Sequence, residues 1–105
     1  MSLPTQFVLR ALLADPHAEL YGVEVSDAAG LPSGTVHRIL ARLEELRWVQ
    51  SRWEDIDLKV EGRPARRYFR LTAAGAQQAR TALAEAYQSE SKRRVRILRP
   101  VAEPS

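Results

Sequence analysis

Residues 30–47, GLPSGTVHRILARLEELR, decide the fold that this sequence predicts. From position 33 to 47 the apolar side chains follow the i, i+3, i+4, i+7, i+10 spacing of one buried helical stripe: Val36, Ile39, Leu40, Leu43 and Leu46. The opposite side carries small and polar residues: Gly34, His37, Arg38, Ala41 and Glu45, with Ser33 and Arg42 on its flanks. We therefore expect an amphipathic helix with a bare, partly basic outer side.

Two helices are predicted to precede it. Residues 5–15, TQFVLRALLAD, space their apolar side chains as a helix does, and the pair Asp15-Pro16 ends that helix. Residues 21–29, YGVEVSDAA, form a second helix that ends at Gly30, where a left-handed conformation suits glycine. Two short helices joined by a tight turn with a glycine make a helix-turn-helix unit.

A β-hairpin is predicted to follow. Residues 48–54, WVQSRWE, and 66–72, RRYFRLT, have the composition and alternation of strands. Their connection contains a turn signal at Gly62-Arg63-Pro64. Alternation of Ile56, Leu58 and Val60 with polar residues predicts that the first strand continues into this connection. The expected hairpin is the wing of the fold, and it carries basic residues at its tip and along one strand.

The last predicted element is a long helix. Thr72 suits its N-cap, its end falls between Ser91 and Leu98, and Pro100 is a hard stop. Most of its apolar residues are alanines, which bury little area but let another helix approach closely. We interpret it as a dimerisation helix; the alternative is a helix packed on its own subunit. The fold class is thus α+β, mainly α: a winged helix-turn-helix at 1–72, with a dimerisation helix and basic tail at 73–105.

Composition restricts the class of protein. The chain has 105 residues, of which 45% are hydrophobic and 28% charged, as in a soluble globular domain. It has no cysteine, which excludes disulfides, thiolate metal sites and cysteine nucleophiles. No apolar run approaches the length of a membrane span, and the N-terminus lacks the pattern of a signal peptide. We expect a cytoplasmic protein.

The net charge is only +3, but the cations are clustered. Four arginines fall within residues 63–70, and five cations within 92–99: Lys92, Arg93, Arg94, Arg96 and Arg99. Clustered arginine is typical of phosphate binding, and also of solvated surfaces with ion pairs. The second cluster either complements the dipole at a helix C-terminus or contacts DNA.

Three stretches resemble the PadR family of bacterial transcriptional regulators: LYGVEV at 20–25, LPSGTVHRILARLEELRWVQSRWE at 31–54 and GRPARRYFRLTAAG at 62–75. The resemblance implies a dimeric repressor on a roughly palindromic operator, with the wing on the flanking backbone or minor groove. The short C-terminal element is similar to that of the compact subgroup, in which ligands enter at the dimer interface. His37 stands where many members have tyrosine, so operator preference does not carry over.

The candidate DNA contacts lie on the third helix and the wing. Small residues at Ser33, Gly34 and Thr35 let the backbone approach DNA, and free N–H groups there attract phosphate. His37, Arg38 and, secondarily, Arg42 can reach base edges or phosphates. In the wing, Arg63 suits a minor groove, while Arg66 and Arg67 suit phosphates. Alternation sends these last two to opposite faces, so at least one arginine of the run is expected to be structural.

Other classes of function find little support. No glycine-rich phosphate loop, nucleophile elbow or paired histidine–carboxylate motif is present, so we expect neither an enzyme nor a cofactor. His17 and His37 lie far apart without a carboxylate pattern, which argues against a metal site. The candidate contacts of a small-molecule effector are Trp48, Trp53 and Tyr87; the favoured interpretation of each is an ordinary packing residue. The alternative function is a winged-helix module that binds protein, which would place apolar residues on the outer side of 33–42.

Overall fold

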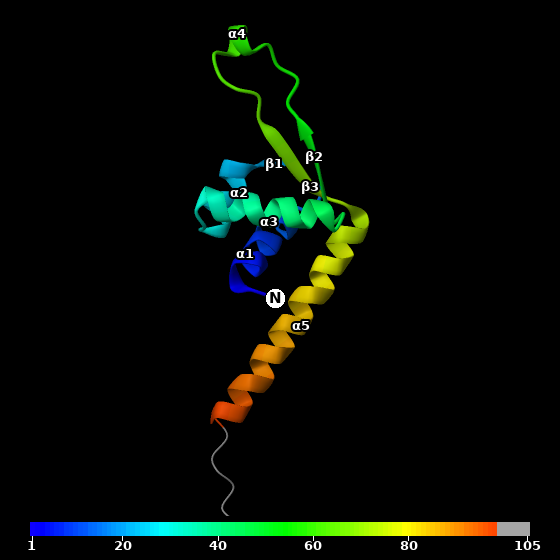
Figure 1. Ribbon diagram of the computed structural model, residues 1–105. Helices are drawn as coiled ribbons and strands as arrows, with labels where there is room; N and C mark the ends of the chain where they lie inside the picture. The colour runs from blue at the N-terminus through cyan, green and yellow to red at the C-terminus, as the bar shows by residue number, and fades with distance from the viewer. Residues whose placement is uncertain (99–105) are drawn as a thin grey trace, which may run out of the picture.

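Three short helices, a small antiparallel sheet and one long C-terminal helix make up the fold (Figure 1). The computed structural model describes residues 1–98, so Arg99 and the predicted stop at Pro100 lie outside it. The elements are α1 (Leu3–Leu13), β1 (Leu20–Tyr21), α2 (Gly22–Ala29), α3 (Ser33–Glu45), β2 (Val49–Trp53), α4 (Leu58–Glu61), β3 (Arg67–Leu71) and α5 (Ala73–Leu98). The predicted mainly helical α+β class is confirmed.

The core lies between α1, α2, α3 and one face of the sheet. The buried residues of α3 are Val36, Leu40 and Leu43, as the stripe predicted, and Ile39 is half-buried. The prediction for Leu46 is wrong, because its side chain is 53% exposed. The helix ends one residue earlier, and the chain then turns away. The other buried residues are Val8, Leu9, Leu12, Val25, Val49, Phe69, Leu71, Ala76 and Ala79.

Two helices start at other residues than predicted, one because of a cap and one because of a neighbouring strand. Helix α1 begins at Leu3, two residues early, because the Ser2 hydroxyl accepts a hydrogen bond from the Thr5 N–H. Helix α2 begins one residue late, at Gly22, because Tyr21 belongs to β1. The predicted left-handed conformation of Gly30 is confirmed by its φ of 68°.

The sheet has the strand order β1-β3-β2, and all pairs are antiparallel. Val49 pairs with Leu71 at one end of the hairpin and Trp53 with Arg67 at the other. Strand β1 adds only the pairs Leu20–Phe69 and Tyr21–Tyr68. Two residues are too few to show alternation, so sequence reasoning missed this strand.

The tip of the wing differs from its prediction. Instead of a continued strand, residues 58–61 form the single helical turn α4. The Asp57 carboxylate accepts a hydrogen bond from the Lys59 N–H at its start, and Gly62, with φ 65°, ends it. These local caps outweigh the alternating pattern. Residues 55–61 carry Asp55, Asp57 and Glu61 against Lys59, so this part of the tip is acidic, and the predicted basic residue at the turn signal is Arg63.

Helix α5 starts against the core and then leaves it (Figure 1). Its predicted N-cap is confirmed: the Thr72 hydroxyl accepts a hydrogen bond of 2.8 Å from the Gly75 N–H. Ala76 and Ala79 are buried and Leu83 is half-buried, whereas Tyr87 and Val95 are exposed. The helix thus packs on its own chain only along its first turns, and the molecule reaches 78 Å along its longest axis. No helix within residues 1–98 has the length and apolar character to span a membrane.

Gly75 allows the closest contact between α5 and the rest of the fold. A Cβ at this position would lie 1.9 Å from the Trp48 carbonyl oxygen, so one of the two backbones would have to move. We expect Gly75→Ala to lower the free energy of unfolding by about 1–3 kcal/mol, as overpacking does. Urea denaturation measures this change.

Gly34→Ala is the matched control, because no atom lies within 4 Å of the added Cβ. It should leave stability unchanged or raise it by up to about 1 kcal/mol through helix propensity. Equal midpoints for the two variants would contradict the close contact at Gly75.

Candidate nucleic-acid interface

The start of α3 is uncovered, and its backbone donors are free of side-chain caps. Pro32 occupies the N-cap position with an extended backbone and supplies no capping side chain. Ser33 and Gly34 are exposed, Thr35 is half-buried, and no atom lies within 4 Å of where a Cβ of Gly34 would be. A helix start with unsatisfied N–H groups and small side chains is suited to an approaching phosphate.

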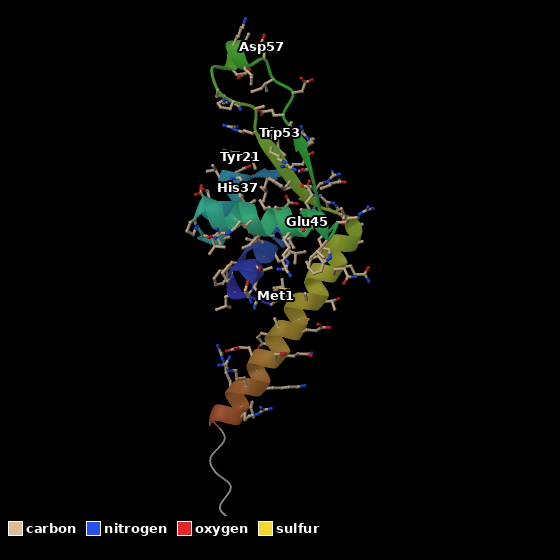
Figure 2. The ribbon with its side chains drawn as sticks, in the orientation of Figure 1. Met1, Tyr21, His37, Glu45, Trp53 and Asp57 are labelled. Atoms are coloured by element: carbon tan, nitrogen blue, oxygen red, sulfur yellow. The ribbon has the colours of Figure 1, made fainter. Side chains whose placement is uncertain are left out.

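His37 has a packing role in addition to its exposed position (Figure 2). Its Cε1 atom lies 3.0 Å from where a Cβ of Gly22 would be, so the imidazole crosses the start of α2. Glycine at position 22 permits this approach, which holds the two helices of the helix-turn-helix close together. His37 also lines the groove between α3 and the sheet, whereas Arg38 lines the groove on the α1 side.

Helix α3 forms a ridge between two grooves. On the α1 side, a groove of about 630 Å³ is lined by Arg38 and Arg42, one helical turn apart, and by Met1 and Pro4. Within residues 1–98, neither arginine has a carboxylate at ion-pair distance. The structure therefore places two cations without a carboxylate partner along this side of α3, Arg38 in its middle and Arg42 in its last turn.

On the wing side, a groove of about 580 Å³ separates α3 from the sheet. Arg67 lies in it and is bound within the protein: its Nη2 donates to both Glu44 carboxylate oxygens at 2.9 and 3.2 Å. Its Nε donates to the Ser51 hydroxyl at 3.0 Å, and its guanidinium lies 5.8 Å from the ring centre of Trp53. Arg67 thus joins the wing to α3, a tertiary contact that strand alternation alone does not predict.

Arg66 lies on the opposite face of the hairpin, so the predicted division of the arginine run is confirmed. Its guanidinium stacks 4.4 Å from the ring centre of Tyr21, which itself meets Tyr68 edge-on at 5.8 Å. Arg52, which sequence reasoning did not single out, lies over Tyr68 and pairs with Glu19. The arginines of this face are ordered by aromatic rings, and Tyr21 reaches them only because β1 pairs with β3.

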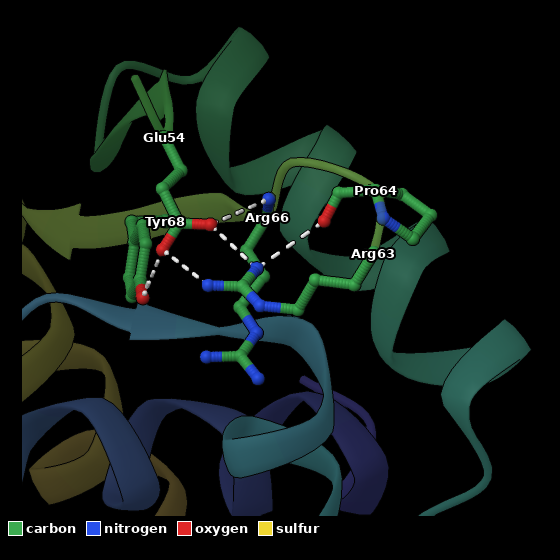
Figure 3. A network of polar contacts seen from close by, with 5 residues as sticks. All are labelled: Glu54, Arg63, Pro64, Arg66 and Tyr68. Atoms are coloured by element: carbon green, nitrogen blue, oxygen red, sulfur yellow. Dashed lines mark hydrogen bonds and ion pairs between the residues drawn. The ribbon is translucent and has the colours of Figure 1, made fainter. Parts of the chain in front are cut away.

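The Glu54 carboxylate holds together the two sides of the wing below its tip, where Glu54 lies opposite Arg63 and Arg66 (Figure 3). We call this place the neck of the wing. Glu54 accepts hydrogen bonds from Arg63 at 2.6 and 3.2 Å and from the Tyr68 hydroxyl at 3.2 Å. The Arg66 backbone N–H adds a longer bond of 3.4 Å. The hydrogen bond from Arg63 lowers the pKa of Glu54 from 4.5 to about 2. Arg63, predicted to enter a minor groove, is held at the neck by this pair.

Of the three aromatic residues interpreted as packing residues, only Trp48 packs against the core. Trp53 and Tyr87 are 64% and 70% exposed, so that interpretation is wrong for them within this chain. Trp53 shares a face of β2 with the buried Val49, and its ring lies beside the Arg67 guanidinium at the far end of the strand. His17 is exposed, as predicted. Among residues 1–98, no group of three or more potential metal ligands lies together.

Comparison with known proteins adds family and fold information. The model of the Transcriptional regulator PadR-like family matches residues 12–81, more than half of the chain. A PadR family transcriptional regulator from Eggerthella lenta superposes with a TM-score of 0.70 at 20% identity, covering 94% of this chain and 87% of that one. A PadR family regulator from Clostridium difficile gives 0.69 at 20%, covering 92% and 99%.

A third solved structure, MepR, a transcription regulator of the Staphylococcus aureus multidrug efflux pump MepA, gives a TM-score of 0.60 at 18% identity, with 92% and 65% covered. At these identities the solved structures show a shared fold. A search of curated proteins found no match. The shared fold confirms the predicted winged helix-turn-helix.

The lowered pKa of Glu54 predicts how acid destabilises the wing. Its charged form stabilises the fold above pH 4.5, and this contribution is lost as the pH falls through about 2. We expect the free energy of unfolding of Glu54→Gln to be lower than that of the wild type at pH 7 and to fall less steeply between pH 4.5 and 2. Urea titrations across this range measure both quantities.

Glu85→Gln, at an exposed position of α5, is the control for the loss of one charge. Its acid profile should follow the wild type. If Glu54→Gln gave the same profile as Glu85→Gln, the ion pair with Arg63 would not stabilise the fold.

Proposed function

The chain belongs to the PadR-like family of transcriptional regulators, which bind DNA, and from this premise we propose that it is a homodimeric repressor that recognises a roughly palindromic operator. The observation that carries the proposal is the open start of α3, followed along the helix by Arg38 and Arg42, which have no carboxylate partner within residues 1–98. An α-helix fits the major groove, where each base pair presents a distinct pattern of donors and acceptors. A protein-binding module would need apolar side chains on this face, which instead exposes Gly34, His37 and Arg38.

In the proposed complex, the first turn of α3 makes the deepest contact. Ser33 and Thr35 hold phosphates through their N–H and hydroxyl groups, and Gly34 lets the backbone approach the bases. His37 and Arg38 read base edges, and Arg42 contacts a base or phosphate one turn later. Arg38 is the strongest candidate for direct readout, because its guanidinium is free and can donate two hydrogen bonds to guanine.

The wing contributes through its strands and not through its tip. The three carboxylates of residues 55–61 are repelled by phosphate. Arg66 and Arg67 are the proposed phosphate contacts: Arg67 lies in the groove beside α3, and Arg66 lies over Tyr21 on the other face of the hairpin. Arg63 contributes by holding the neck through Glu54, with any reach into a minor groove secondary. The wing therefore acts as a rigid flank along the DNA backbone.

The second half of α5 is the proposed dimerisation surface. Tyr87 and Val95 are exposed there, and the small side chain of Ala86 leaves room for a close second helix. Two copies paired through α5 would present two α3 helices to one palindrome, as two-fold symmetry requires. Such a repressor acts on chromosomal DNA, so the proposal includes a cytoplasmic location.

Arg38→Ala tests base readout. We expect its affinity for an operator, obtained by selection from a random DNA pool, to fall by the equivalent of about 1–3 kcal/mol. Its affinity for random DNA should fall much less, since one free cation among several is lost. Mobility-shift titrations on both DNAs measure the ratio. Arg10→Ala, which removes an exposed arginine from α1, is the control and should leave the ratio unchanged. Equal losses on both DNAs would make Arg38 a phosphate contact.

Tyr87→Glu tests the dimer. A charge buried in a helix pair is destabilising, so we expect the variant to sediment as a monomer at concentrations where the wild type is a dimer. Gln88→Glu adds the same charge at the neighbouring, already polar position and should remain dimeric. A wild-type chain that sediments as a monomer would contradict dimerisation through α5.

A further inference from the structure

Arg67 of the wing is already paired with a carboxylate of α3, the proposed recognition helix. Glu44 accepts both contacts of the Arg67 Nη2 atom, and the two side chains remain 35% and 42% exposed. Partly exposed ion pairs stabilise a fold little, because water already solvates both charges. A phosphate offers the same anionic oxygens and can replace the carboxylate on Arg67 with little cost to the fold.

The pair lies where a DNA strand would pass. The wing-side groove runs along α3 from His37 to Glu45, and Trp53 and Phe69 form its other wall. Figure 2 labels His37, Glu45 and Trp53 of this lining. His37 and Ala41 belong to the exposed side of α3 that the proposed function assigns to the major groove. With α3 seated and the wing beside it, the intervening phosphate backbone lies over this groove and over the guanidinium of Arg67.

We propose, resting on the function proposed above, that Glu44 is a specificity-determining residue that withholds Arg67 from DNA until α3 is seated. On random DNA, α3 stays shallow and Arg67 remains bound to Glu44. On the operator, base contacts draw α3 into the groove, and a backbone phosphate displaces the carboxylate. Arg67 then adds a phosphate contact to the operator complex alone. Glu44 thereby lowers non-specific binding without weakening operator binding equally.

The salt dependence of DNA binding reports whether Arg67 contacts a phosphate. Each phosphate that a protein neutralises adds about 0.9 to the slope of log affinity against log salt concentration. We expect Glu44→Gln to free Arg67 and to steepen the slope on random DNA by about 0.9. That change is about a 3.5-fold greater loss of affinity between 50 and 200 mM salt. The slope on the operator should stay at its wild-type value, and the operator-to-random affinity ratio should fall.

Glu45→Gln is the matched control. Glu45 is the next residue, lines the same groove, and has no ion-pair partner within the described part of the chain. Removing its charge should raise affinity for both DNAs alike without changing either slope. In a Glu44→Gln/Arg67→Gln double variant, the steeper slope on random DNA should disappear.

Arg67→Gln provides a second test that keeps Glu44 in place. It should flatten the slope on the operator by about 0.9 and leave the slope on random DNA unchanged. If Glu44→Gln and Glu45→Gln behave alike, or if Arg67→Gln changes both slopes equally, the role of Glu44 is refuted while DNA binding stands. A wild-type chain without salt-dependent affinity for any DNA would instead refute the proposed function itself.

Discussion

The burial of one side of α3 is the constraint on which the other features depend. Val36, Leu40 and Leu43 are buried against α1 and the sheet, and each such side chain contributes about 1.5–3 kcal/mol relative to exposure. Together they fix the rotation of the helix about its axis far more strongly than surface charges, which contribute tenths of a kcal/mol. The exposure of Gly34 and Arg38 is therefore a consequence of the core.

Elements with local signals could be predicted from the sequence, and those that depend on tertiary contacts could not. The stripe of α3, the left-handed Gly30 and the cap at Thr72 each depend on a few neighbouring residues. The prediction that the first strand continues into the wing tip is wrong, because the helical turn that Asp57 and Gly62 cap outweighs the alternating apolar pattern. The partners of the wing arginines were beyond prediction, since Glu44 and Arg67 are joined only when the hairpin folds back along α3.

Ion pairs within the fold reduce the number of wing arginines that are free to bind phosphate. Counted along the sequence, the wing offers a dense run of cations. In the fold, Arg63 is paired with Glu54, Arg67 with Glu44 and Arg52 with Glu19. On α3 itself, the guanidinium groups of Arg38 and Arg42 have no carboxylate partner among the residues that the structure describes, although these arginines are less conspicuous in the sequence. A cluster of arginines in the sequence is therefore a poor indicator of phosphate binding. The number of arginines that have no carboxylate partner within the fold is a better one.

The junction between α3 and α5 links the helix proposed to bind DNA to the helix proposed to form the dimer. Arg47, with a left-handed φ of 62°, turns the chain out of α3, and the Thr72 hydroxyl donates to its carbonyl at 2.9 Å. One residue later, the Trp48 carbonyl lies against Gly75 in the first turn of α5. The end of the recognition helix and the start of the proposed dimerisation helix are therefore held by the same few atoms. In a dimer built on α5, this junction sets the angle and separation of the two α3 helices. In that proposed dimer, residues 47–48 and 72–75 would set the spacing of the half-sites, although they lie outside the helix proposed to read the bases.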